Sequence, residues 1–364
     1  RTAGVGAPGV GLQGANVTVT LDGGTVTGGV EPAFFSRANA FDFTGGTNVL
    51  AVGTGSTITG GIGVEGTLEF RQATDLTLSN VISGGGSISK TQAGVLTLSG
   101  ANTYSGTTTV SGGTLSISSD SNLGTGAVTL DGGTMVVSAT TTIDNAFAIG
   151  AGGGSLSTSI GAVVTLSDAL SGTGALTKVE RGQLNLSADS SGFSGNITVS
   201  SGSVQIANAL GSQDVALSGG TVTVDGNAAS WTIAGNTVIG GTGSGRVTVR
   251  NAATVTAGAV VLGNANGAFG GIGISGTGSS WGSDSLSVGY SGTGSVAIWD
   301  DATVTVGSGT GTALLGVLSD GAGTLTIGPD ISIPADTPGT LSAGAVGFGL
   351  GSGTLVFNHT DTAY

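Results

Sequence analysis

One long run of sequence occurs twice in this chain. The first copy, SISKTQAGVLTLSGANTYSGTTTVSGGTLSI, occupies residues 87–117, and a more divergent copy, ALTKVERGQLNLSADSSGFSGNITVSSGSVQI, occupies residues 175–206. Lys90 of the first copy recurs as Lys178 of the second, and Tyr104 recurs as Phe193. A repeated sequence predicts a repeated structural unit that stacks on its neighbours.

Alternation of residue types indicates the secondary structure. Val17, Val19 and Leu21 alternate with polar residues, and the same period of two returns along the chain. The short alternating runs end at glycine pairs, where sharp turns need positive φ. The 74 glycines lack the strict period of three that collagen requires, and 38% hydrophobic residues are too many for a disordered chain. An all-β protein is therefore expected.

The spacing of glycine-rich segments separates two all-β architectures. Four segments of similar pattern begin at Gly240, Gly263, Gly289 and Gly316, so one unit has about 25 residues. A β-sandwich domain needs roughly 100 residues, so such a unit must stack on its neighbours to bury a core. The pattern favours a β-solenoid, an elongated rod of parallel strands without a separate globular domain.

Charge and composition exclude several partners. The formal net charge is −13, with 8 Lys and Arg against 21 Asp and Glu, so we expect no binding to nucleic acid, which requires basic residues. No stretch of about 18 apolar residues occurs, so we expect no insertion of this fragment into a membrane. The absence of cysteine excludes disulfides and thiolate metal sites.

The motifs resemble those of a known family. The run from Leu96 to Ile117, and more loosely the run from Leu184 to Ile206, resembles the passenger-associated transport repeat of autotransporter (type V secretion) passenger domains. The glycine-rich segments from Gly240 to Gly328 resemble a second repeat type of large adhesin-like passengers. We therefore expect a β-helix with transport repeats at residues 1–227, coils of the second type at 228–343, and the start of a further, truncated coil at 344–364.

The resemblance implies a fold, a location and partners. It implies a right-handed parallel β-helix, exported and carried across the outer membrane by a C-terminal β-barrel translocator that is not among these residues. The protein would lie at the bacterial cell surface, on the extracellular face of the outer membrane, or be secreted. Passengers with such repeats are mostly adhesins, so the expected partner is a host cell-surface or extracellular-matrix component, or another copy of the chain, with roles in cell adhesion, biofilm and virulence.

The sequence predicts no enzyme. The one histidine, His359, cannot by itself supply a Ser-His-Asp arrangement, and the glutamates are scattered. Most aspartates stand beside glycine, where their side chains cap turns. We therefore expect no catalytic residues, no metal site and no cofactor.

The aromatic residues give one candidate ligand-binding patch. Trp231 and Trp281 share a repeated slot and are predicted to lie in the core. Trp299 should point outward, because Val296 and Ile298 point inward, and its counterpart one repeat earlier is Arg250. With Asp300, Asp301 and Tyr290, these residues form the candidate patch, the alternative being an isolated surface aromatic side chain.

Two other functions remain open. The chain could be a passive β-helical stalk that displays a distal domain, because its longest departures from the repeat, residues 30–40 and 328–340, are short. A β-helical enzyme that degrades glycans is less favoured, since it needs converging carboxylates.

Overall fold

The computed structural model describes residues 12–31, 36–330 and 334–362. The chain divides into two compact units, residues 1–168 (the N-terminal unit) and residues 169–364 (the C-terminal unit). Pro32, Phe34 and Phe35 of the predicted insertion at residues 30–40 lie outside the described residues. The described part contains no α-helix, and its two short 3-10 helices are η1 (Asp120–Asn122) and η2 (Gly307–Gly309).

Short strands make up the N-terminal unit. They are β1 (Leu12–Ala15), β2 (Thr18–Leu21), β3 (Thr25–Thr27), β4 (Val30–Glu31), β5 (Ser36–Arg37), β6 (Phe41–Gly45), β7 (Thr47–Val52), β8 (Thr57–Thr59), β9 (Ile62–Val64), β10 (Thr67–Phe70), β11 (Leu76–Leu78), β12 (Ile82–Ser83), β13 (Ser87–Lys90), β14 (Val95–Leu98), β15 (Thr108–Val110), β16 (Thr114–Ile117), β17 (Val128–Leu130), β18 (Thr134–Val137), β19 (Thr141–Ile143), β20 (Phe147–Ile149), β21 (Gly154–Thr158) and β22 (Val163–Leu166).

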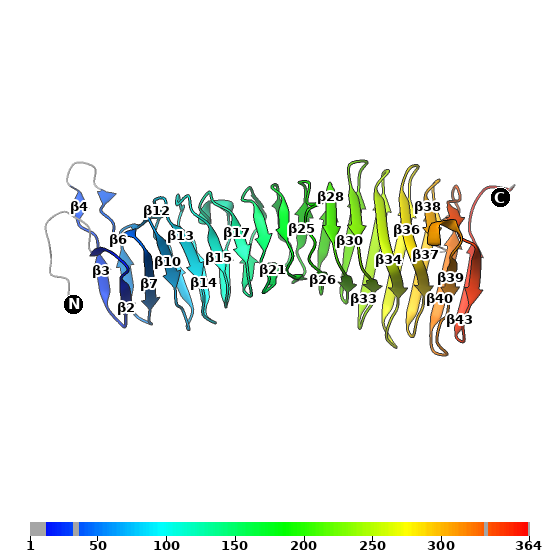
Figure 1. Ribbon diagram of the computed structural model, residues 1–364, viewed down its shortest axis with the longest axis horizontal. Helices are drawn as coiled ribbons and strands as arrows, with labels where there is room; N and C mark the ends of the chain where they lie inside the picture. Colours follow the sequence, from blue (N-terminus) through cyan, green and yellow to red (C-terminus); the bar gives the residue numbers. More distant parts are fainter. Residues whose placement is uncertain (1–11, 32–35, 331–333, 363–364) are drawn as a thin grey trace. The chain divides into compact units, whose positions relative to one another are not determined.

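These strands pair in parallel with strands of the next coil. One ladder runs β2-β7-β10-β13-β15-β17-β20 and a second runs β11-β14-β16-β18-β21 (Figure 1). The pairing of β4 with β5 is antiparallel. Chain neighbours such as β13 and β14 lie in different ladders, so each coil of chain contributes one strand to each face and rests on the coil before it.

The C-terminal unit has longer strands. They are β23 (Leu170–Gly172), β24 (Leu176–Val179), β25 (Gln183–Leu186), β26 (Ile197–Val199), β27 (Ser203–Ile206), β28 (Ala209–Ser212), β29 (Val215–Leu217), β30 (Gly220–Asp225), β31 (Ser230–Ile233), β32 (Thr237–Ile239), β33 (Ser244–Arg250), β34 (Thr254–Leu262), β35 (Phe269–Ser275), β36 (Ser280–Val288), β37 (Thr293–Trp299), β38 (Thr303–Val306), β39 (Thr312–Leu315), β40 (Ala322–Ile327), β41 (Thr340–Ser342), β42 (Ala345–Phe348) and β43 (Ser352–Phe357).

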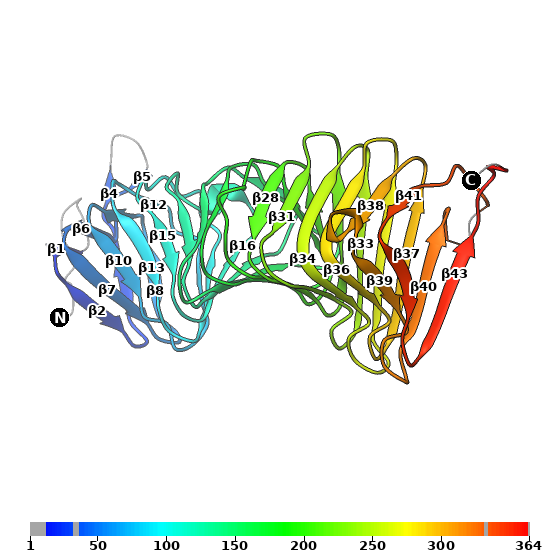
Figure 2. The same cartoon turned by 45° about the vertical axis from the view of Figure 1, so that its right-hand side comes forward.

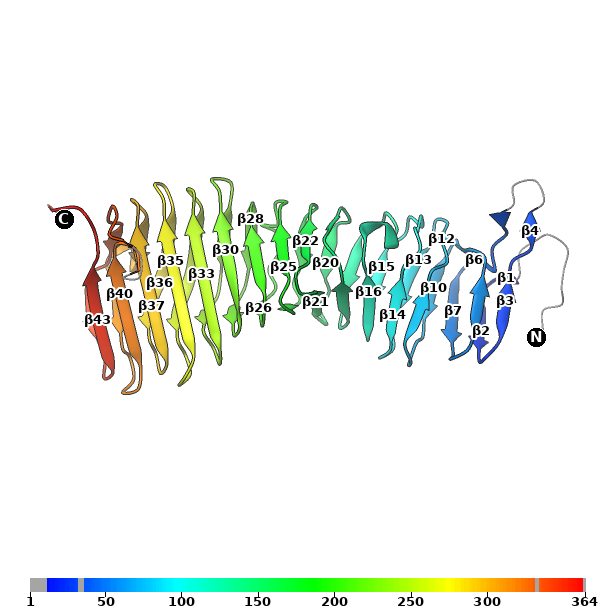
Figure 3. The same cartoon turned by 180° about the vertical axis from the view of Figure 1, so that it is seen from behind.

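Parallel ladders also build this unit. The ladder β25-β27-β30-β33-β35-β37-β40-β43 forms one face, and the part from β30 onward is seen side by side in Figure 3. On another face β34 pairs with β36 over most of its length, as Figure 2 shows from the side. The prediction of an all-β, parallel β-solenoid is thus confirmed within each unit.

Inward side chains stack into apolar ladders. In the N-terminal unit Leu96, Leu115 and Met135 occupy successive paired positions and are fully buried. In the C-terminal unit Val222 and Val247 begin a similar ladder, which continues through Ile272, Val296 and Leu325. Because the side-chain period of a strand is two, every second residue is left on the outer face.

Glycine is required where the C-terminal coils turn closely. The four segment glycines of the sequence pattern, represented by Gly263 and Gly289, all adopt positive φ, with values of 62° and 71° at these two. A Cβ atom at Gly289 would overlap the carbonyl group of Ala322 in the next coil. The recurrence of glycine therefore reports both the turn conformation and the close approach of neighbouring coils.

Candidate functional site

The candidate patch lies at one corner of the C-terminal unit. Strands β33, β35 and β37 end there in register, with Arg250 opposite Ser275 and Ser275 opposite Trp299. The sequence had placed Arg250 one repeat before Trp299. That spacing was wrong, because β35 forms a complete coil between them. Two ladder steps of about 4.8 Å put the two residues about 10 Å apart.

Arg250 is held by an acidic partner on the preceding coil. Its Nη2 donates to Oδ2 of Asp225 at 2.8 Å, and Nδ2 of Asn251 donates to Oδ1 of the same carboxylate at 2.6 Å. Partial burial acts to raise the pKa of Asp225, but the hydrogen bonds from Asn251 and Arg250 hold that pKa below its ordinary value. The charge of Arg250 is therefore largely neutralised by Asp225.

Asp300 and Asp301 form the turn after β37. Both residues have positive φ, 57° and 60°, and their backbone N–H groups donate to the carbonyl oxygens of Thr337 and Pro338 at 2.8 and 3.2 Å. Oγ1 of Thr277 donates to Oδ2 of Asp301 at 3.3 Å. The two exposed carboxylates lie at the corner beside Trp299 and carry negative charge there.

Trp299 points outward, as the alternation predicts, and is half-buried. Its indole reaches back over the preceding coil, where atoms Cη2 and Cζ3 lie 3.4 and 3.5 Å from the position that a Cβ of Gly273 would occupy. The ring thus covers a place on β35 that has no side chain.

Tyr290 does not join this group. It follows β36 and precedes β37, whereas Trp299 is the last of the seven residues of β37. A strand of that length spans about 20 Å, so Tyr290 lies at the opposite corner of the coil. The short separation of Tyr290 and Trp299 in the sequence suggested that the two side chains are close. Because the extended strand β37 lies between them, they are far apart.

Sequence reasoning missed two residues on the same outer face. Phe269, the first residue of β35, points outward and lies over Gly271, with Cε1 and Cζ at 3.1 and 3.2 Å from the position of a Cβ there. Arg246 on β33 places its guanidinium 5.9 Å from the centroid of the Phe269 ring. The run FGGIGIS could have indicated this contact, because glycine at two outward positions of one strand leaves room for neighbouring side chains.

The core of the C-terminal unit contains a second unusual feature, a buried lysine. Lys178 is 1% exposed, and its Nζ donates to the carbonyl oxygens of Val179 and Glu180 at 2.7 and 2.8 Å. Burial lowers the pKa of Lys178 to about 8, although the nearby charge of Glu180 acts to raise it. Lys90, its counterpart in the N-terminal unit, is also fully buried and donates to the carbonyl oxygen of Gln92. Burial lowers the pKa of Lys90 as well.

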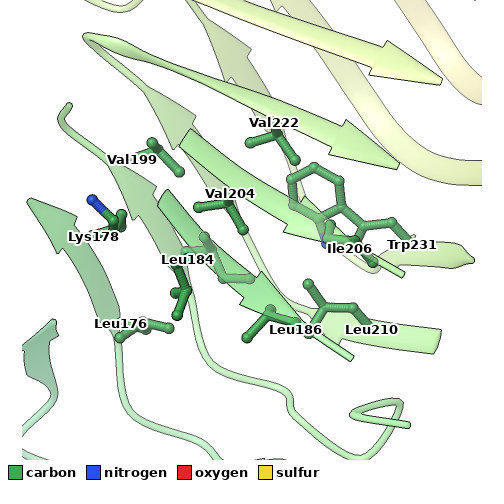
Figure 4. A pocket seen from close by; sticks show the side chains of 11 residues that line it. Leu176, Lys178, Leu184, Leu186, Val199, Val204, Ile206, Leu210, Val222 and Trp231 are labelled. Atoms are coloured by element: carbon green, nitrogen blue, oxygen red, sulfur yellow. The ribbon is translucent and has the colours of Figure 1, made fainter. Parts of the chain in front are cut away.

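A small cavity borders Lys178. Its volume is about 10 Å³, and apolar side chains from several strands point into it, as Figure 4 shows, among them Leu176, Leu184, Val204 and Trp231. That volume is close to the minimum for one water molecule, so the cavity is a packing defect and not a ligand pocket. Trp231 and Trp281 are each 1% exposed, which confirms their predicted place in the core.

Metal-binding clusters and membrane-spanning helices are both absent from the part of the chain that the structure describes. Residues 12–31, 36–330 and 334–362 contain no cluster of three or more His, Cys, Asp and Glu side chains arranged to hold a metal ion. Within the same ranges, no helix has the length and apolar character needed to cross a membrane. His359 contacts the ring of Phe357 edge-on, with the ring centroids 6.1 Å apart.

Comparison with known families identifies the repeated runs. The passenger-associated-transport-repeat matches residues 88–117 and 171–206, the two copies seen in the sequence. Two such repeats in a β-solenoid fit an autotransporter passenger domain. No curated protein and no solved structure gave a match. Passenger repeats imply an extracellular or cell-surface protein, in agreement with the location expected from the sequence.

Proposed function

We propose that this passenger segment is a non-enzymatic adhesin at the bacterial cell surface. It mediates adhesion to host cells or matrix, self-association in aggregation and biofilm, or both, and in this way contributes to virulence. The observation that carries the proposal is the repetition of outward polar side chains from coil to coil. Thr77, Thr97 and Ser116 occupy successive paired positions in the N-terminal unit, and Thr223 and Thr248 do so in the C-terminal unit.

Repetition makes weak contacts effective. One hydrogen bond contributes about 1 kcal/mol net, which is too little to hold a partner alone. Side chains spaced about 4.8 Å apart along a ladder meet a repetitive partner many times, and linked contacts multiply their effect. A polymer on a host surface and a second copy of the chain are both repetitive partners.

Display on a non-adherent bacterium tests the proposal. Cells that display the chain should bind more immobilised matrix than cells that display the translocator alone, or should settle faster from suspension. If displayed cells neither bind nor settle, the adhesin proposal fails and the passive stalk is supported.

The stalk is the second candidate, and the short turns between strands favour it. Asn251, Ala252 and Ala253 alone connect β33 to β34, and the first two adopt positive φ, so little loop protrudes at that corner. A glycan-degrading enzyme is the least favoured function. The carboxylates of Asp131 and Asp225, which catalysis would need, already accept hydrogen bonds from other groups of the chain. Oδ1 of Asp131 accepts from the backbone N–H of Gly152 at 2.7 Å, while Asp225 binds Arg250.

A further inference from the structure

The outer face of β33, β35 and β37 carries a group of neighbouring side chains in the C-terminal unit. The three strands lie side by side in Figure 3. We call this group the aromatic shelf and define it as Arg246, Phe269, Gly271, Gly273 and Trp299.

Two glycines create the shelf. Gly271 and Gly273 take alternate outward positions of β35, about 6–7 Å apart along the strand. Phe269 covers the first and Trp299 the second, so two rings lie over neighbouring bare positions of one strand. Both glycines are buried beneath the rings, whereas Phe269 and Trp299 are half-buried and keep a surface toward solvent.

Arg246 supplies a positive charge at one end of the shelf. Arg71 pairs with Glu69 and Arg250 pairs with Asp225, whereas Arg246 forms no ion pair with a carboxylate among the residues that the structure describes. Its side chain is exposed, and its guanidinium lies by the Phe269 ring. Arg181 is also exposed and forms no ion pair among the described residues, so the feature that distinguishes Arg246 is the aromatic ring beside it.

A shallow hollow adjoins this arginine. It has a volume of about 220 Å³ and is lined by Gly220, Thr221, Ser244, Gly245, Arg246 and Phe269. The hydroxyl groups of Thr221 and Ser244 provide donors and acceptors at its rim. The surface of the hollow is therefore mostly apolar, and the guanidinium and hydroxyl groups lie at its edge.

We propose that the aromatic shelf binds an acidic polysaccharide, with sugar rings over Phe269 and Trp299 and a carboxylate at Arg246. The negative face of an aromatic ring attracts the polarised C–H groups of a sugar ring, and a guanidinium pairs with a carboxylate. This inference rests on the adhesin proposal and names its ligand class.

The charges around the shelf fix the direction of the ligand. Asp300 and Asp301 lie at the corner beyond Trp299, where they repel an acidic group. Arg250 near that corner is already paired with Asp225. The acidic groups of the polysaccharide therefore face the Arg246 end. The sugar ring over Trp299 points its carboxylate away from Asp300 and Asp301.

Calorimetric titration of the purified chain with two matched probes tests the proposal. The probes are a hexamer of galacturonic acid and the methyl ester of the same hexamer, which keeps the sugar rings and removes the charge. The acid should bind at least about fivefold more tightly than the ester, because only the acid can pair with Arg246. Equal affinity for acid and ester would overturn the proposal.

Matched variants locate the site. Arg246→Gln and Trp299→Ala should each weaken binding of the acid at least about fivefold, since each removes one of the proposed contacts. The controls are Arg181→Gln, an exposed arginine of the same unit, and Tyr290→Ala, an aromatic residue at the opposite corner. A control that weakens binding as much as its partner variant would contradict the site.

Gly273→Thr separates loss of the site from loss of the fold. Thr248 stands at the paired position of the preceding coil, so threonine suits this strand, yet its side chain would displace the indole of Trp299. The variant should keep its thermal unfolding midpoint and lose affinity for the acid. Unchanged affinity would show that the shelf is not the site. If displayed cells adhere but the chain does not bind the hexamer, the aromatic shelf proposal is wrong and the adhesin proposal stands. If the chain binds the hexamer but displayed cells do not adhere, the adhesin proposal is wrong.

Discussion

At the scale of residues, the two buried lysines are the least expected feature. Lys90 and Lys178 take inward positions, where a charged group is costly unless it is hydrogen-bonded. Backbone carbonyl groups that follow each lysine in the chain, and that of Gly112 in the next coil for Lys90, accept the hydrogen bonds of the ammonium groups. The sequence shows that lysine recurs in both transport repeats, but not that it lies inside.

The first prediction concerns pH and Lys178. Its pKa of about 8 in the folded chain lies below the ordinary value of 10.5, so between these values the unfolded chain binds more protons. The free energy of unfolding should therefore rise as pH increases from about 8 to 10.5. Lys178→Met should remove part of this rise, as measured by denaturant unfolding at pH 7 and pH 10. Equal changes with pH in both proteins would refute the assignment.

The second prediction concerns the indole of Trp281. Nε1 of Trp231 donates to Oγ of Ser212 at 3.1 Å, whereas Nε1 of Trp281 is buried without a partner. Ser212 stands two residues after the strand partner of Trp231, and the corresponding residue for Trp281 is Ala257. Ala257→Ser should supply the missing acceptor and stabilise the chain by about 1 kcal/mol.

Thermal unfolding checks this change against Ala313→Ser. Ala313 is buried and pairs with Leu286 and Val346, so a hydroxyl group there should destabilise the chain. The prediction fails if both substitutions lower the unfolding midpoint.

At the scale of elements, alternation and glycine spacing were enough to predict strands and stacking. Inward residues such as Leu96 and Val222 are buried as the pattern required. The contact of Trp299 with Gly273 could not be predicted, because it depends on which residues of successive coils stand in register. For the same reason the sequence placed Arg250 one coil too near to Trp299 and grouped Tyr290 with them.

The third prediction tests a turn glycine. Gly289→Ala should destabilise the C-terminal unit by more than about 2 kcal/mol, because φ is positive there and the methyl group would overlap Ala322. Gly192→Ala is the matched control, since Gly192 is exposed and its Cβ would meet nothing within 4 Å. Denaturant unfolding should separate the two variants. Similar stability of both would argue against close packing of the coils at Gly289.

At the scale of the whole molecule, charge governs contact between copies. The net charge of −13 repels a second copy over distances within the Debye length of about 8 Å at physiological salt. Salt screens this repulsion, and mild acid removes part of it by protonating carboxylates.

The fourth prediction follows from this repulsion. Self-association of the chain, followed by light scattering, should increase on adding salt or on mild acidification. Aggregates that dissolve on adding salt would show that attraction between charges holds the copies together, and the mechanism of polar ladders would then be wrong.

Register between coils is the claim from which the polar ladders and the aromatic shelf both follow, and spin labels can measure it. The chain has no cysteine, so labels attach only to introduced ones. Thr109 and Thr129 are paired on the outer face of β15 and β17, whereas Thr97 lies on β14 in another ladder. Labels at Thr109→Cys and Thr129→Cys should lie within about 10 Å and broaden each other strongly, because parallel strands are about 4.8 Å apart. Labels at positions 97 and 109 should broaden less, and equal broadening of the two pairs would contradict the parallel stacking of coils.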